Sequence, residues 1–166
     1  ATGPNFHGDG SYSNCCTAPM PESGGGNFTG DPLCGSAATG DWRLGAGSPC
    51  VDAGIHGFWM DTASDLGGEP RVRFDAVDCG AYEYWPAIVY VSLLGAHNAP
   101  YDTWREAATN IQSAVDAVRS AGVVWVTNGI YATGGRPAPS MAVTNRVCIT
   151  NPVVVCSVNG AAVTAI

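Results

Sequence analysis

The stretch "AVDCGAYEYWPAIVYVSLLG", residues 76 to 95, decides the fold prediction because it holds both a predicted closing strand and a predicted opening strand. Residues 78–84 are typical of a last strand that closes a domain. Residues 88–92 alternate as the first strand of a new domain does. We therefore predict three parts: a first domain at 1–84, a linker at 85–87 and a second domain at 88–166.

The composition favours short strands joined by tight turns. Only 13% of the 166 residues are charged, while 22 are glycine and 11 are proline. The net charge of −7, with no lysine in the chain, argues against nucleic acid or an anionic membrane as a partner. No apolar run approaches the roughly 20 residues that span a bilayer, so membrane insertion is not predicted. The N-terminal residues also lack the pattern of a signal peptide, so we expect none within this chain.

Seven cysteines indicate a disulfide-stabilised protein that is secreted, outside the cell or at its surface. Their spacing contains no C-x-x-C and no Cys/His run, which argues against structural zinc. The odd number leaves one thiol free or linked between chains. Cys148 and Cys156 lie in apolar runs and fit small buried side chains equally well. The disulfide candidates are Cys15 or Cys16 with Cys34, and Cys50 with Cys79, since each pair lies within one half of the chain.

One amphipathic helix is predicted, over residues 103–120. Its apolar residues fall at helical spacing on one face, which requires a surface to cover. Thr103 and Glu106 are spaced for a capping box, and Gly122 marks the predicted end. Trp125 is predicted to lie in the core. The predicted apolar face consists of Trp104, Ala108, Ile111, Val115 and Val118.

Short β-branched runs in residues 123–166, nearly all bounded by Asn or Gly, predict strands that turn corners repeatedly. Such strands would stack in parallel as the coils of a solenoid, whose first open edge the helix would cover. A βαβ sandwich is the competing fold, but it requires more helices. Residues 1–40 are predicted to be loops stapled by disulfides, and residues 41–84 short strands and turns.

Several motifs resemble secreted right-handed parallel β-helix proteins, the pectin-lyase-like repeat proteins of the bacterial cell-surface or adhesin type. "DWRLGAGSPCVDAG", "DLGGEPRV" and "AVDCGAYEY" resemble the closing segment of that family, whereas "IVYVS", "IQSAVDA" and "VVWVTNGIY" resemble its start. The resemblance implies a mainly β fold, a right-handed parallel β-helix with one capping helix. The end precedes the start here, which fits either a fragment across two tandem domains or a repeating unit.

Two departures from the family pattern affect the predicted chemistry. Gly67 stands where the family has aspartate, which weakens any cation site in that turn. Cys79 stands where the family has an apolar residue, which favours a disulfide with Cys50.

No catalytic constellation emerges, so no enzyme activity, catalytic residue, metal or cofactor is predicted. H-E-x-x-H, G-x-S-x-G and phosphate-binding glycine motifs are missing from the sequence. The histidines, at positions 7, 56 and 97, lie far apart in loops. The dense acidic group of the chain is Asp61, Asp65, Asp75 and Asp78, and its last two members could equally pair with Arg71 and Arg73.

The predicted function is a structural or adhesive extracellular module whose copies join in a tandem array or a head-to-tail fibre. The candidate residues for the joint are Val153, Val155, Val163, Trp59 and Trp85. Asn27 begins a glycosylation sequon. The predicted partner is the protein itself, with extracellular polysaccharide as a further possibility. The alternative function is a carbohydrate-binding or polysaccharide-cleaving protein whose active coils lie outside this chain.

Overall fold

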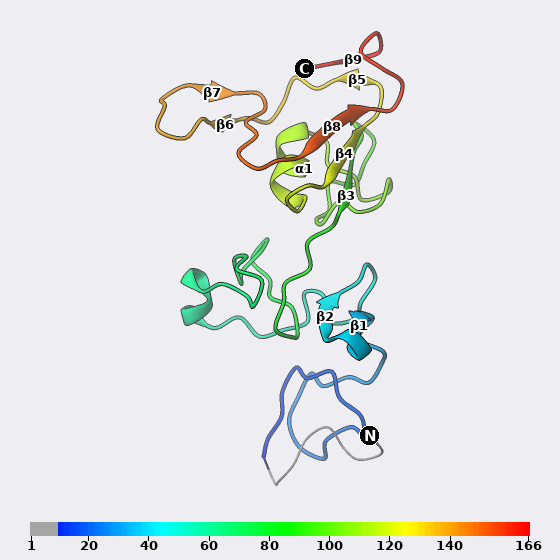
Figure 1. Ribbon diagram of the computed structural model, residues 1–166, viewed down its shortest axis with the longest axis vertical. Helices are drawn as coiled ribbons and strands as arrows, with labels where there is room; N and C mark the ends of the chain where they lie inside the picture. Colours follow the sequence, from blue (N-terminus) through cyan, green and yellow to red (C-terminus); the bar gives the residue numbers. More distant parts are fainter. Residues whose placement is uncertain (1–9) are drawn as a thin grey trace. The chain divides into compact units, whose positions relative to one another are not determined.

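A computed structural model describes residues 10–166, apart from the side chain of Ala37 (Figure 1). The chain divides into two compact units: unit 1 ends at Tyr84, and unit 2 runs from Trp85 to Ile166.

Unit 2 is built on a parallel sheet of three strands in the order β3-β4-β8. These are β3 (Ile88–Val91), β4 (Val123–Val126) and β8 (Val154–Ser157). The predicted opening strand is thus confirmed at β3. The register places Val89, Val124 and Val155 side by side on the face that meets the core.

Helix α1 (Ile111–Ala117) covers this face of the sheet (Figure 1). Side chains from the helix interlock with those of β3 and β4, which removes the apolar surface of both elements from water. Tyr131 is fully buried in the same cluster, although the sequence did not single it out. The buried cluster consists of Val89, Val91, Tyr101, Ala108, Ile111, Ala114, Val115, Ala117, Val118, Val124, Val126 and Tyr131.

The helix is shorter than the predicted range 103–120, which was wrong in its first half. Residues before Ile111 follow the edge of β3 instead: the Ser92 N–H donates to the Ala108 carbonyl at 2.9 Å. Only one of the two bonds of the predicted capping box is present, from the Glu106 N–H to Thr103 Oγ1 at 3.2 Å, and it stabilises a turn instead of a helix start. The helix begins only after Asn110, whose side chain accepts a hydrogen bond from the Ser113 N–H.

The predicted end of the helix and the predicted burial of two tryptophans were also wrong. The helix ends at Ala117, five residues before the predicted stop at Gly122. Trp104 is 44% exposed and lies against Tyr90 with 4.3 Å between ring centroids, and Trp125 is 36% exposed. Both tryptophans therefore lie at the surface, outside the core.

The remaining strands of unit 2 are only two residues long. β5 (Gly129–Ile130) pairs in parallel with β9 (Thr164–Ala165). β6 (Arg136–Pro137) and β7 (Thr144–Asn145) form an antiparallel pair.

Unit 1 is mainly loops and turns with one antiparallel pair, β1 (Cys34–Ser36) and β2 (Asp41–Leu44). Two short 3₁₀ helices, η1 (Ala37–Thr39) and η2 (Phe58–Thr62), are also present. The predicted closing strand at 78–84 is wrong, because this segment consists of bends and extended residues without ladder pairing.

The predicted parallel β-helix is contradicted by these sheets. Residues 10–166 form small separate sheets, of which two are antiparallel, and they contain no stack of solenoid coils. The strands span only two to four residues. The chain also reverses direction between β1 and β2 and between β6 and β7, which gives antiparallel pairs. Apolar residues of the predicted coils at 141–150 consequently join no ladder of parallel strands, and Met141, Val143 and Ile149 are exposed.

Candidate functional site

The two edges of the three-stranded sheet differ. The β3 edge is covered within unit 2: the Tyr90 N–H donates to the Tyr101 carbonyl, and the Ala108 N–H donates to the Tyr90 carbonyl, both at 2.9 Å. β8 pairs with β4 on one side, and no strand in the described part of the chain pairs with its other side. The sheet therefore has one closed edge and one open edge.

The hydrogen bonds of β8 define which backbone groups the open edge presents. The Val154 N–H donates to the Gly122 carbonyl at 3.0 Å, and the Val158 N–H donates to the Val126 carbonyl at 2.9 Å. Because successive residues of a strand direct their peptide groups to opposite sides, those of Val155 and Ser157 face away from β4. An open row of this kind can accept another strand.

The five predicted joint residues lie in different places. Val153 and Val155 are half-buried and pack against the core cluster of unit 2, whereas Val163 is exposed near β9. Trp85 is half-buried at the start of unit 2. Trp59 is 67% exposed in η2 of unit 1. Only Val153 and Val155 thus lie at the open β8 edge.

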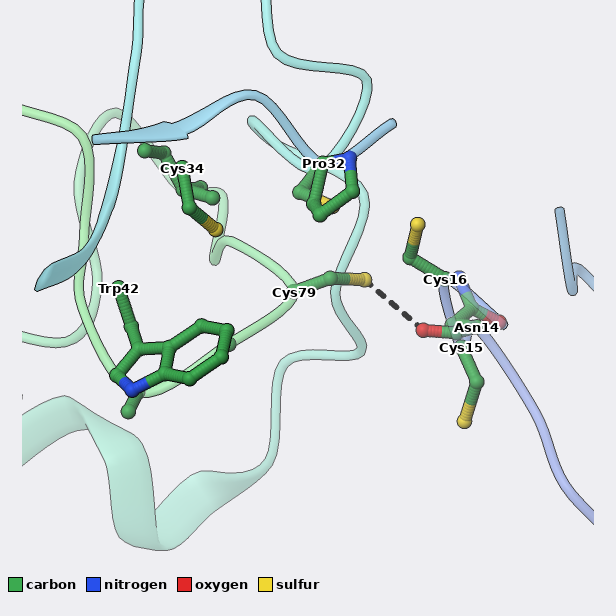
Figure 2. Close-up of a pocket in the computed structure, with 11 residues that line it drawn as sticks. Asn14, Cys15, Cys16, Pro32, Cys34, Trp42 and Cys79 are labelled. Carbon is green, nitrogen blue, oxygen red and sulfur yellow. Dashed lines mark hydrogen bonds between the residues drawn. The ribbon is translucent and has the colours of Figure 1, made fainter. Parts of the chain in front are cut away.

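The five predicted disulfide cysteines, which are Cys15, Cys16, Cys34, Cys50 and Cys79, line one cavity of unit 1 of about 470 Å³ (Figure 2). These residues were predicted from the sequence as separate pairs, and the structure brings all five to one cavity. All seven cysteines are free thiols in the structure. The other two lie in unit 2, where Cys148 is buried and Cys156 is half-buried on β8.

Several thiols of the cavity are hydrogen-bonded and shifted in acidity. Burial, followed by a hydrogen bond with the Cys16 thiol, raises the pKa of Cys50 to about 11. Burial and the nearby Cys50 raise the pKa of Cys79 to about 11. The Cys79 thiol donates to the Asn14 carbonyl at 2.9 Å (Figure 2). Raised pKa values keep these thiols protonated, which makes them weak nucleophiles at neutral pH.

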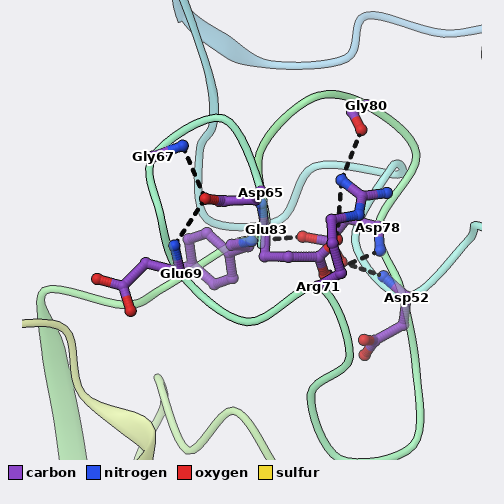
Figure 3. Close-up of polar contacts among 9 residues, drawn as sticks. Asp52, Asp65, Gly67, Glu69, Arg71, Asp78, Gly80 and Glu83 are labelled. Atoms are coloured by element: carbon purple, nitrogen blue, oxygen red, sulfur yellow. Dashed lines mark hydrogen bonds and ion pairs between the residues drawn. The ribbon is translucent and has the colours of Figure 1, made fainter. Parts of the chain in front are cut away.

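A second polar cluster of unit 1 holds its closing turns together (Figure 3). Asp65 accepts hydrogen bonds from the Gly67 and Glu69 N–H groups at 2.7 and 2.9 Å, and from the Glu83 N–H at 2.9 Å. Asp78 accepts from the Asp52 N–H at 2.8 Å. These carboxylates therefore bind backbone groups, two in the turn that Asp65 begins and two in segments 18 and 26 residues away.

Glu83 lies at the centre of this cluster and is almost completely buried. Its carboxylate accepts from the Asp78 N–H at 3.1 Å and forms an ion pair with Arg71 at 3.2 Å. Burial, followed by the nearby Asp78 carboxylate, raises the pKa of Glu83 to about 7. Glu83 was not among the predicted site residues; the available signal in the sequence was a charged residue placed between two aromatic ones, in "AYEY".

The remaining candidate residues have local structural contacts. His56 pairs with Asp61 at 2.6 Å on the surface, and His97 accepts from the Thr109 N–H at 2.9 Å. His7 lies outside the described residues. Asp75 is exposed in a turn next to Phe74. His56 and Asp61 thus form a surface pair, whereas Asp65 and Asp78 both lie around Glu83.

The sequon residue Asn27 is engaged inside its own loop. Its Nδ2 donates to the Tyr12 carbonyl at 2.7 Å, and its Oδ1 accepts from the Cys15 N–H at 3.0 Å. A glycan on Nδ2 would replace one of the two hydrogens of this amide nitrogen. Asn27 therefore shapes the loop that carries Cys15 and Cys16.

Residues 10–166 contain neither a candidate metal-binding cluster nor a helix that could span a membrane. No group of three or more His, Cys, Asp or Glu side chains is placed to bind a metal ion there. No helix in this range has the length and apolar character required to cross a bilayer.

Comparison with known proteins identifies no family for this chain. The resemblance noted in the sequence therefore remains a prediction, and the β-helix that it implied is contradicted by the sheets described above. No family model matches the chain, and no curated protein or solved structure matches it.

Proposed function

We propose that this chain is a structural module that works outside the cell by joining a second copy of itself through the open edge of β8. The observation that carries the proposal is the contrast between the covered β3 edge and the open β8 edge. Strand addition at an open edge gains backbone hydrogen bonds for both partners.

The chemistry of the edge favours a second copy as the occupant. Residues 153–158 carry no charged side chain, although the chain has a net charge of −7. Two copies can therefore meet here without placing like charges opposite each other. Two β8 strands running antiparallel are also self-complementary, which is the requirement for a twofold contact between identical chains.

The core of unit 2 is incomplete on the same side. Val89 and Val124 are fully buried, but Val155, next to Val124 in the register, is only half-buried. A strand added beyond β8 would cover Val155 and remove more apolar surface from water, which stabilises the joint by roughly 25 cal/mol per Å².

The smallest assembly that this proposal requires is a dimer. An extended array would need a second and different joint, because a closed twofold contact uses the same surface on both copies. The covered β3 edge is not free for that role. Trp59, exposed in unit 1, remains a candidate for a second joint.

The test is sedimentation velocity of the full chain over a range of concentrations, with two matched variants. Val154→Glu places a charge on β8, where the wild-type side chain is 52% exposed. Ile130→Glu places the same charge on β5, where the wild-type side chain is also exposed. We expect the wild type and Ile130→Glu to form dimers and Val154→Glu to associate at least tenfold more weakly, since the added charge would lose solvation at the joint.

Equal association of the two variants would contradict the proposal, because the joint would then lie elsewhere. A wild-type chain that stays monomeric at every concentration but is retained on a polysaccharide column would also overturn it, in favour of carbohydrate binding.

A further inference from the structure

We propose that Asn159, in the loop between β8 and β9, is a site of spontaneous modification at which the side-chain amide is lost and aspartate or isoaspartate forms (Figure 1). Gly160 follows it, and the chain holds a second Asn-Gly pair at Asn128 and Gly129. The structure distinguishes the two pairs. The proposal does not depend on self-association through β8.

The local sequence makes both asparagines reactive. The reaction begins when the backbone nitrogen of the following residue attacks the side-chain amide carbon of asparagine. Glycine in that position favours the attack, because no side chain shields its nitrogen and its backbone has the widest freedom. Asn128 and Asn159 are both exposed, and each follows a β-branched residue. A difference in their reactivity must therefore come from the tertiary structure.

The backbone nitrogen of Gly129 is held in a strand pair. Its N–H donates to the Val163 carbonyl at 2.9 Å, within the parallel pairing of β5 with β9. The Leu93 side chain also lies against this glycine, since a Cβ at Gly129 would stand 2.7 Å from Leu93 Cδ1. Attack on Asn128 therefore requires local opening of the β5–β9 pair.

The backbone nitrogen of Gly160 is not held in this way. Its carbonyl accepts from Ser157 Oγ at 3.1 Å and from the Val163 N–H at 3.4 Å, but within residues 10–166 its own N–H donates no hydrogen bond. Outside its chain neighbours, no heavy atom lies within 4 Å of the place where a Cβ would stand. The nitrogen can therefore turn toward the Asn159 amide without breaking a hydrogen bond of its own.

The reaction needs only water and hydroxide. The Gly160 nitrogen loses its proton to hydroxide and bonds to Cγ of Asn159. The bond from Cγ to Nδ2 breaks, and this nitrogen takes a proton from water and leaves as ammonia. Water then adds to either carbonyl of the resulting cyclic imide and opens it, which gives aspartate or isoaspartate.

The modification would break a contact between two loops of unit 2. Asn159 Nδ2 donates to Asn128 Oδ1 at 2.8 Å, which ties the loop after β8 to the loop after β4. A carboxylate at position 159 cannot donate this bond, and its negative charge would face the Asn128 oxygen. The new charge would also stand next to the uncharged stretch 153–158.

The experiment follows both asparagines in one sample by tryptic peptide mapping with mass spectrometry. The folded full chain is incubated at mildly alkaline pH, and each time point is corrected for the sample digested at the start. Peptide 120–146 carries Asn128, and peptide 147–166 carries Asn159. We expect Asn128 to react about tenfold more slowly than Asn159, which is the protection that one backbone hydrogen bond of ordinary strength provides.

The same incubation in concentrated urea is the control, because unfolding removes the strand pair and should make the two rates similar. Asn159→Gln should lower the ammonia released by the folded chain, whereas Asn128→Gln should leave it nearly unchanged. A folded chain in which Asn159 reacts no faster than Asn128 would overturn the proposal. A difference of the same size in urea would also overturn it, since the cause would then be the local sequence. The wild-type comparison is decisive without either variant.

Discussion

At the scale of single residues, Glu83 has the most unusual environment in the described part of unit 1. A buried carboxylate normally requires compensation, and Glu83 receives it from Arg71 and from the Asp78 N–H. The pKa of Glu83 nevertheless rises to about 7, because burial and the Asp78 carboxylate together outweigh these contacts. The folded unit therefore binds a proton at Glu83 more tightly than the unfolded chain does.

This shift predicts a specific pH dependence of stability. Since the pKa is raised from 4.5 to about 7 on folding, the stabilisation from the protonated form is complete below pH 4.5 and is lost as pH rises to about 7. Glu83→Gln should flatten this part of the curve. The measurement is the urea midpoint between pH 4.5 and pH 8, followed by tryptophan fluorescence.

Glu22→Gln, which changes an exposed glutamate of the same unit, serves as the control for Glu83→Gln and should retain the wild-type slope. Identical slopes in wild type and Glu83→Gln would assign the pH dependence to other groups. Burial also raises the pKa of Asp78, so any slope that remains in Glu83→Gln should have the same sign.

At the scale of elements, α1 shows how a long apolar pattern can give a short helix. The pattern from Trp104 to Val118 is helical throughout, yet the part before Asn110 pairs with β3 instead. This pairing gives the backbone groups at the β3 edge hydrogen-bond partners. They would lack these partners if the helix started at Thr103, because helical backbone groups bond within the helix. The side chain of Asn110 then begins the helix by accepting the Ser113 N–H at 2.9 Å.

Removal of this cap should destabilise unit 2 measurably. Asn110→Ala leaves the Ser113 N–H without its side-chain acceptor and should lower the free energy of unfolding by about 1 kcal/mol. Asn110→Asp keeps an acceptor at the same position and should remain within about 0.5 kcal/mol of the wild type. Urea titrations followed by far-ultraviolet circular dichroism measure both values. An equal loss in the two variants would show that the amide has a different role.

At the scale of the whole molecule, the two units differ in how they are stabilised. Unit 2 contains the apolar cluster of α1, β3 and β4, and this cluster includes only residues after Tyr84. Unit 1 relies on turns, the buried carboxylates of Figure 3 and the cavity thiols of Figure 2. We therefore expect the units to respond differently to separation and to reducing agents.

The fragment 85–166 should fold alone, because its core needs no residue of unit 1. Its amide spectrum should overlay the corresponding signals of the intact chain, with the residues of β3 and β4 still protected from hydrogen exchange. Dithiothreitol should leave these signals unchanged. A poorly dispersed spectrum of the fragment would show that unit 2 depends on unit 1.

The sequence by itself determined the local features of this protein: the opening strand at 88–91, the helical face of residues 111–117 and the turn-rich first half. These follow from spacing and composition, which act between near neighbours in the chain. Tertiary structure alone decided which strands pair, where the helix begins, and that Glu83 is buried with Arg71. The physical reason is that strand pairing and the burial of charge depend on partners far away in sequence, and a β-branched run fits many of them. The stretch at 76–95 illustrates both outcomes, because its second half forms β3 as predicted whereas its first half forms turns around a buried carboxylate.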